Sequence, residues 1–124
     1  MQHTTLSRAA CLELLAATDI ARVLISVRCL PAALPARITL HNNSRLLLAS
    51  SEEPVIVAAQ RGEVLAVQID GLESDGTTWS VIASGIARPC TVTTTLPHSL
   101  VQALSRGARL IEVPVTVVAG ERVG

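Results

Sequence analysis

Two apolar stretches separated by a short polar turn constrain the fold of this chain more than any other feature. Residues 63–70 and 78–88 both have the composition of a β-strand, and the second alternates in polarity as far as Gly85. The turn between them ends in Gly76, a residue type that accepts the tight backbone of a hairpin. The sequence therefore predicts two long neighbouring strands at the centre of a sheet.

Trp79 stands at the start of the second of these strands. It is the only tryptophan in a chain that has no Phe and no Tyr. A large amphipathic ring used once, at the head of an alternating strand, suggests a packed sheet corner beside a cavity. Two roles stay open at this point, because such a ring can line a ligand cleft or can close a core or an interface.

The rest of the chain predicts shorter elements with short connections. Ser7 is a suitable N-cap for an opening helix that has Cys11 on its apolar stripe. Further strands are predicted at 21–27, 33–40, 45–49 and 108–118, and further helices at 55–61 and 97–104. The turn signal His41-Asn42-Asn43-Ser44 predicts that the strands 33–40 and 45–49 form a hairpin. The order predicts a mainly β, α+β fold: a small closed or split β-barrel of about six antiparallel strands, in a single domain over residues 1–124.

Composition argues against several classes of protein. The ten basic residues balance ten acidic ones, and without Tyr or Phe to stack on bases the chain shows little that would bind nucleic acid. All ten basic residues are Arg, which excludes mechanisms that need a lysine. No apolar run is long enough for a membrane helix. With 49% hydrophobic residues, the domain is expected to cover part of its surface with a partner chain.

The cysteines and the N-terminus bear on compartment. Cys11, Cys29 and Cys90 are odd in number and widely spaced, which is typical of reduced thiols. No Cys/His cluster has the spacing of a metal site. The first residues show no basic region followed by an apolar core, as a secretory signal would. We therefore expect a cytoplasmic protein without a bound metal.

A series of short motifs runs through nearly the whole chain. The motifs are Leu6-Ser7-Arg8, Cys11 to Ala16, Ala21-Arg22-Val23, Leu34-Pro35-Ala36, Ala58 to Gly62, Val67-Gln68-Ile69-Asp70, Trp79-Ser80-Val81 with Gly85, and Ile111-x-Val113-Pro114. In order and spacing, this series resembles the pyridoxamine 5′-phosphate oxidase-like, flavin-binding split-barrel family. The resemblance implies a homodimer with flavin mononucleotide (FMN), or deazaflavin F420 in some members, lying between the two subunits.

The resemblance also implies where a cofactor phosphate would bind. In that family the strand equivalent to residues 45–50 ends in an Arg-Thr-like pair, and a Gly-Thr-Lys-like stretch follows it. Here the corresponding positions are Ala49 and Ser50, then Ser51 and the Glu52-Glu53-Pro54 segment. Hydroxyl donors are kept at Ser50 and Ser51, but the cationic clamp is largely missing, and two carboxylates would oppose a phosphate there.

Four further positions complete the predicted site. Trp79 and Ser80 match the family pattern. Arg37 and Arg61 could replace the missing clamp from neighbouring elements, because a guanidinium binds phosphate through two hydrogen bonds. The alternative for both arginines is a solvated or ion-paired place on the surface. The family's Pro-x-Asn-Tyr-like segment corresponds to residues 35–38, with Arg37 and Ile38 in place of its polar and aromatic members.

Two functions are compatible with these residues. The first is a dimeric oxidoreductase that depends on FMN or, as second choice, F420, with the cofactor supplying the redox chemistry. The second is a dimeric barrel that has lost its flavin, binds no cofactor and serves as a small-ligand-binding or interaction module. The degenerate clamp favours the second, while the Trp79 match fits either. A differently anchored ligand such as haem is a third alternative.

Overall fold

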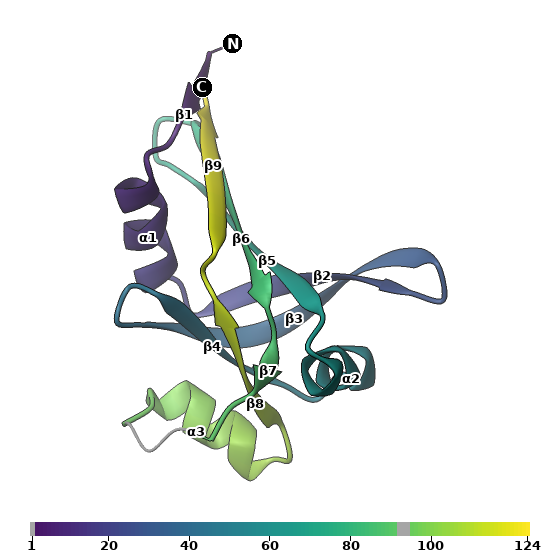
Figure 1. Cartoon of the computed structure of the whole chain (residues 1–124). Coiled ribbons are helices and arrows are strands. Elements are labelled where there is room, and N and C mark those ends of the chain that lie inside the picture. The colour runs from purple at the N-terminus through teal and green to yellow at the C-terminus, as the bar shows by residue number, and fades with distance from the viewer. Residues whose placement is uncertain (1, 92–94) are drawn as a thin grey trace.

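The structure, a computed structural model, describes residues 2–91 and 95–124. The strands in this part of the chain are β1 (His3–Thr5), β2 (Ile20–Val27), β3 (Leu30–His41), β4 (Arg45–Ser50), β5 (Val64–Leu72), β6 (Thr78–Ile86), β7 (Arg88–Pro89), β8 (Arg109–Pro114) and β9 (Val117–Val123) (Figure 1). The helices are α1 (Arg8–Ala16), α2 (Glu53–Arg61) and α3 (His98–Ser105).

All the described strands belong to one antiparallel sheet, in the order β1-β9-β6-β5-β2-β3-β4-β8-β7. The sheet is not closed by hydrogen bonds, because β1 and β7 are its two edge strands. However, β8 and β9 are parts of one segment, and they pair with β4 and β6, which lie on opposite sides of the sheet order. The segment 109–123 therefore joins the two sides of a curved sheet into a split barrel. The predicted class, mainly β with short helices, is confirmed.

The change of partner between β8 and β9 depends on a glycine in β6. A Cβ on Gly85 would collide with the carbonyl oxygen of Pro114. Beside this contact the Thr116 N–H donates a hydrogen bond to the Ser84 carbonyl oxygen at 3.2 Å. Gly85 thus lets the chain cross from one ladder to the other at close range, which no residue with a side chain would permit.

The described chain forms nine strands where about six were predicted. The predicted strand 78–88 is divided into β6 and the short β7, and the predicted strand 108–118 into β8 and β9. The third addition is β1, whose three residues pair with the end of β9. Pro114 is the last residue of β8, and the change of partner follows at residues 115–116.

Two tight turns shape the hairpins. Asn42 and Asn43 have φ values of 52° and 54°, and the Ser44 N–H donates to the His41 carbonyl oxygen at 3.1 Å. Asparagine tolerates this left-handed conformation, and the pair connects β3 to β4 as the sequence predicts. A second pair with positive φ, residues 28–29, connects β2 to β3 at the tip of a hairpin that projects from the barrel (Figure 1).

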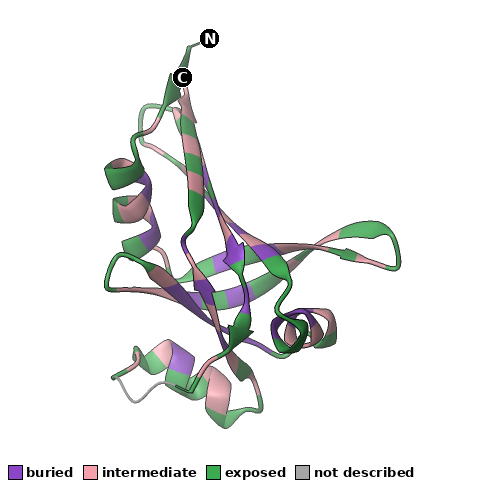
Figure 2. Ribbon diagram, in the orientation of Figure 1, coloured by how far each residue is buried: buried purple, intermediate pink, exposed green. Residues whose placement is uncertain are grey.

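Strand alternation places one face of each central strand in the core. On β5 the inward residues Leu65, Val67 and Ile69 are at most 2% exposed, and on β6 Val81 and Ala83 are fully buried. These positions meet across the sheet, with Val67 opposite Ala83 and Ile69 opposite Val81. The buried segments converge on the middle of the barrel (Figure 2). The core is therefore the one that the polarity pattern predicts.

The strand β4 is buried on both faces. Leu46 and Leu48 join the main core, whereas Leu47 and Ala49 point the other way and form a second cluster with Leu100 of α3. Leu47 and Leu100 are both fully buried. The helix α3 therefore covers the outer face of this part of the sheet and lies beside β4.

The helix α1 packs against the other end of the barrel. A Cβ on Gly120 of β9 would lie 2.8 Å from the Sγ of Cys11, so the glycine allows the helix to approach. Arg8 donates a hydrogen bond from Nη2 to the Val115 carbonyl oxygen at 3.0 Å. Cys11 is fully buried, and burial raises the pKa of its thiol, which agrees with a packing role.

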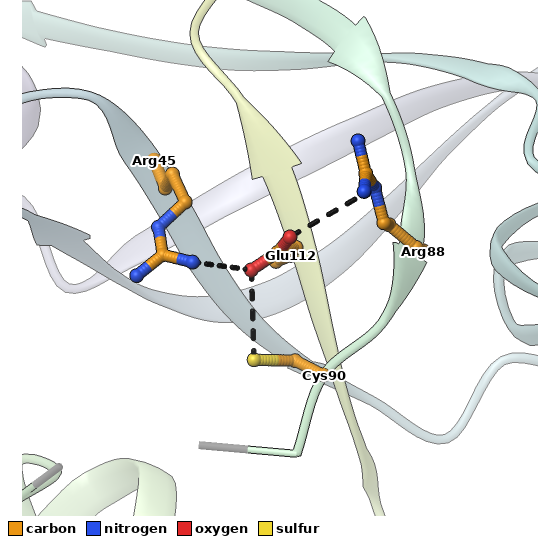
Figure 3. Close-up of polar contacts among 4 residues, drawn as sticks. All are labelled: Arg45, Arg88, Cys90 and Glu112. Atoms are coloured by element: carbon orange, nitrogen blue, oxygen red, sulfur yellow. Dashed lines mark hydrogen bonds and ion pairs between the residues drawn. The ribbon is translucent and has the colours of Figure 1, made fainter. Parts of the chain in front are cut away.

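A polar cluster ties three strands together on the outside of the barrel. Glu112 of β8 accepts a hydrogen bond from Arg45 Nη1 on β4 at 2.9 Å, and Arg88 Nε, at the start of β7, lies 3.9 Å from its other oxygen (Figure 3). The Cys90 Sγ lies 3.8 Å from Glu112 Oε2. The Glu112 side chain is only 14% exposed, so these contacts compensate a largely desolvated carboxylate.

Candidate functional site

A cleft of about 410 Å³ lies where α3 meets the edge of the β3–β4 hairpin. We call it the Arg106 cleft. Its lining residues are Ile20, Pro35, Ala36, Arg37, Ala49, Ser50, Ser51, Glu52, Ala103, Arg106 and Ala108. The cleft is thus built by the middle of β3, the end of β4, the connection to α2, the start of β2 and the C-terminal end of α3 with the residues that follow it.

Four of the seven predicted site residues line this cleft. Arg37 and Ala49 are direct partners in the β3–β4 ladder, and Ser50 and Ser51 follow at the end of β4. The ladder therefore places Arg37 on the outer face beside Ala49, whereas Ser50 has the parity of the inward Leu46 and Leu48, and Ser51, just after the strand, is exposed. Bringing these residues together requires only the hairpin that the Asn42–Asn43 turn closes.

Ser50 connects the cleft to the start of α2. Its side chain is 3% exposed, and its Oγ accepts a hydrogen bond from the Glu52 N–H at 3.1 Å. Glu52 is the N-cap of the helix but makes no side-chain capping bond, and Pro54 occupies the first turn. The helix begins at Glu53, two residues before the predicted start, and ends as predicted at Gly62, which has φ 67°.

The Arg106 cleft carries more positive than negative charge. Arg37 and Arg106 approach it from β3 and from the end of α3, and both residues are exposed. Glu52 is the one acidic residue among its lining residues. Glu53 lies on α2 and is not among the residues that line the cleft. Of the two predicted opposing carboxylates, only Glu52 therefore faces a ligand in this place.

Arg106 is the residue that analysis of the sequence missed. It is the C-cap of α3, far from β4 in sequence, and it reaches the cleft because Leu100 anchors the helix on Leu47. The signal was the continuous apolar run of β4, since a strand that is hydrophobic on both faces needs an element to cover its second face. The helix before Gly107 was the available candidate.

Trp79 and Ser80 line a second cleft, of about 470 Å³, which lies farther along the sheet at β5, β6 and β9. We call it the Ser80 cleft; it is lined by Asp70, Gly71, Leu72, Thr78, Trp79, Ser80, Glu121 and Val123. By alternation Ser80 belongs to the outer face, whereas Trp79 has the parity of the inward Val81 and packs against the core. A Cβ on Gly71 would run into the indole ring. These contacts favour the core role for Trp79.

The remaining residue of the predicted site, Arg61, lies apart from the Arg106 cleft, and so does Ile38 of the family segment 35–38. Arg61 is in the last turn of α2 and is exposed, and it lines neither of the two clefts. Ile38, which takes the place of an aromatic residue in the family segment, is 2% exposed and belongs to the core. The structure therefore joins Arg37 but not Arg61 to the two serines.

Two negative results concern the described residues only. In residues 2–91 and 95–124 no group of three or more His, Cys, Asp or Glu side chains is placed to hold a metal ion. Within the same residues no helix has the length and apolar character to cross a membrane.

Comparison with known proteins identifies the relatives of this fold. A family model described as pyridoxamine 5′-phosphate oxidase matches residues 7–120. No curated protein gives a significant match. The chain is similar to the structure of the FAD-binding protein from Mycobacterium smegmatis, with a TM-score of 0.74 and 22% identity over 99% of this chain and 100% of that chain.

Two more solved structures show the same arrangement. An FAD-binding protein from Mesorhizobium loti has a TM-score of 0.77 and 18% identity, and the whole of both chains is covered. The FAD and haem binding protein from Mycobacterium smegmatis has a TM-score of 0.68 and 14% identity, over 97% of this chain and 72% of that chain. At such identities the likeness establishes the split-barrel fold.

Proposed function

Since this chain belongs to the pyridoxamine 5′-phosphate oxidase family, we propose that it binds a flavin nucleotide whose phosphate lies in the Arg106 cleft. The observation that carries the proposal is that Arg37, Arg106 and the exposed Ser51 line one cleft at the end of β4. The guanidinium groups from β3 and from the end of α3 take the place of the clamp that the sequence lacks, because each can bind a phosphate through two hydrogen bonds. The similar proteins named as FAD-binding support a flavin as the ligand.

The residues of the cleft suit a phosphate group. The exposed Ser51 hydroxyl can donate a hydrogen bond to a phosphate oxygen, whereas the buried Ser50 Oγ accepts the Glu52 N–H and holds the end of β4 against the start of α2. Glu52 opposes the ligand, but two cations against one carboxylate leave a net attraction. When bound, the flavin would supply electron-transfer or hydride chemistry, and the protein would bind and orient it. On this proposal the protein is an oxidoreductase, with FMN as the first candidate and F420 as the second.

The proposal includes a homodimer. The outer face of β5 and β6 carries Val64 and Ile86, direct partners in the ladder that are 66% and 52% exposed. Ile82 of β6 and Val117 of β9 extend this apolar surface. A second copy of the chain would bury it, as the high apolar content leads us to expect. The exposed Cys29 and the buried Cys11, both without a disulfide, fit a reducing cytoplasm.

The test is retention of a flavin. The purified protein is mixed with FMN, FAD or F420 and desalted, and the absorbance of the retained cofactor is measured. We expect retention by the wild type and about 10- to 100-fold weaker binding of FMN by Arg106→Ala or Arg37→Ala, since each removes charged hydrogen bonds. Arg61→Ala is the matched control and should bind as the wild type does.

Failure to retain any of the three would contradict the proposal. The second candidate function, a cofactor-free dimer that binds another small ligand, would then be the better account. Glu52 in the cleft is the observation that favours it. An equal loss in Arg61→Ala and Arg106→Ala would show that general charge, and not the cleft, attracts the flavin.

A further inference from the structure

A third cleft, of about 230 Å³, lies between the Arg106 cleft and the Ser80 cleft. Its lining residues are Ile20, Ala21, Arg22, Pro35, Gln68, Ile69 and Asp70. Ile20 and Pro35 also line the Arg106 cleft, and Asp70 also lines the Ser80 cleft. Because each neighbouring pair shares lining residues, the three clefts follow one another across the outer face of the sheet as one groove.

Strand register explains why polar side chains lie in the middle of the groove. In the ladders Pro35 of β3 is opposite Arg22 of β2, and Arg22 is opposite Gln68 of β5. The inward neighbours Val23 and Val67 are fully buried, so Arg22 and Gln68 are on the outward side of the same sheet row. From β4 to β6 the groove crosses four strand spacings, or about 19 Å along the sheet. Such a track suits an elongated ligand.

The charges of the groove differ between its ends. Arg37 and Arg106 lie at one end, whereas Asp70 and Glu121 lie at the other. A phosphate is attracted to the first end and repelled from the second, which fixes the direction in which a nucleotide can lie. The non-phosphate part of the ligand must then extend over the middle of the groove.

The side chains in the middle of the groove can both donate and accept hydrogen bonds. Gln68 presents an amide that donates and accepts, and Arg22 presents only donors. Arg22 Nη1 lies 3.6 Å from Asp70 Oδ2, and both side chains are more than half exposed, so this pair is weak and leaves the guanidinium able to contact a ligand. A flavin ring has an edge where two carbonyl acceptors flank an N–H donor, which this combination of donors and acceptor matches.

We infer that Arg22 and Gln68 bind the ring edge of the same flavin nucleotide whose phosphate lies in the Arg106 cleft. The inference rests on the proposed function and extends it, since it gives the ligand a direction and assigns two binding residues outside the phosphate site. The apolar side chain of Ile20 and the Pro35 ring, shared by two clefts, form the wall between the two contacts.

The test compares riboflavin, which has the ring and no phosphate, with FMN. Arg22→Ala and Gln68→Ala should each weaken binding of both ligands by about three- to tenfold, the effect of one or two hydrogen bonds. Arg106→Ala should weaken FMN and leave riboflavin unchanged. Gln60→Ala and Arg61→Ala, two exposed positions on α2 outside the groove, are the matched controls.

The outcomes separate this inference from the proposed function. If FMN binds and depends on Arg106, but Arg22→Ala and Gln68→Ala behave as their controls, the groove inference is wrong and the phosphate site stands. If neither ligand binds the wild type, both are wrong. Gln68→Glu keeps the size of the side chain but loses its donor, so it should weaken riboflavin as Gln68→Ala does. A shifted absorption spectrum of the bound ring in these variants would distinguish direct contact from a change in stability.

Discussion

The outer face of the sheet is covered at β4 and bare at β5 and β6. At β4 the outward Leu47 packs under Leu100 of α3, and both side chains are fully buried. At β5 and β6 the outward Val64 and Ile86 are more than half exposed, and no helix of the described residues covers them. The outer face of β4 is thus buried under a helix, whereas these apolar residues on the outer face of β5 and β6 are exposed to solvent. The difference indicates that the second region needs a partner from outside the chain, whereas the first is complete.

The largest effect on stability should come from truncating Leu100, the α3 side chain that packs on the outer face of β4. Leu100→Ala leaves a cavity between α3 and β4, and we expect it to lower the free energy of unfolding by about 2–5 kcal/mol. Val101→Ala on the same helix is the control, because Val101 is 47% exposed and should change stability far less. Denaturant unfolding measures both. Equal effects would mean that α3 does not cover the sheet in the way described.

The bare region is tested by placing a charge on it. Ile86→Glu should weaken the homodimer at least tenfold, because a carboxylate without a partner would be buried in the interface. Sedimentation equilibrium measures the dissociation constant. Val101→Glu adds the same charge at an exposed site on α3 and should leave the association unchanged. A wild-type chain that stays monomeric at all concentrations would rule out this dimer.

A smaller effect, on the affinity for FMN, is expected at the Arg106 cleft, which lies beside α3 at the end of β4. Glu52→Gln removes the carboxylate that opposes a phosphate and should raise the affinity for FMN about two- to fivefold, the range of a surface charge interaction. Glu53→Gln is the control, since Glu53 does not line the cleft. Isothermal titration at low salt measures the change. A gain of the same size in Glu53→Gln would place the phosphate nearer to α2.

The smallest effect concerns the hairpin that joins the two bare strands. Asp75 Oδ1 accepts a hydrogen bond from the Thr77 N–H at 2.9 Å, and hydrogen bonding from Thr77 lowers the pKa of this carboxyl. A lowered pKa stabilises the folded state above the carboxyl's ordinary pKa, and the contribution is lost as the pH falls through the folded value. Asp75→Asn should therefore melt slightly below the wild type at pH 7, with the difference vanishing between about pH 5 and pH 2. A difference in melting temperature that persists at acidic pH would mean that the Asp75 charge is not its cause.

Local patterns predicted the parts of the fold that depend on neighbours in sequence. Alternation identified the buried side of β5 and β6, and the asparagine pair identified the β3–β4 turn. The turn suffices to pair Arg37 with Ala49 at the end of β4. Pairings between distant segments were not predictable in the same way: β1 pairs with β9 from the opposite end of the chain, and Arg106 enters the cleft only because α3 folds back onto Leu47. Neither leaves a periodic signal of its own.

The division of the final segment between two ladders has a consequence for the order of folding. The hairpins β2–β3, β3–β4 and β5–β6 involve near neighbours and can form early, whereas β4 and β6 obtain their second partner, and β1 its partner, only from residues 109–123. During synthesis, each of these three strands therefore has an unpaired edge until the last residues of the segment have left the ribosome. Such edges can pair with other chains. Slow translation of residues 109–123 would prolong this period, and the yield of folded protein should fall with it.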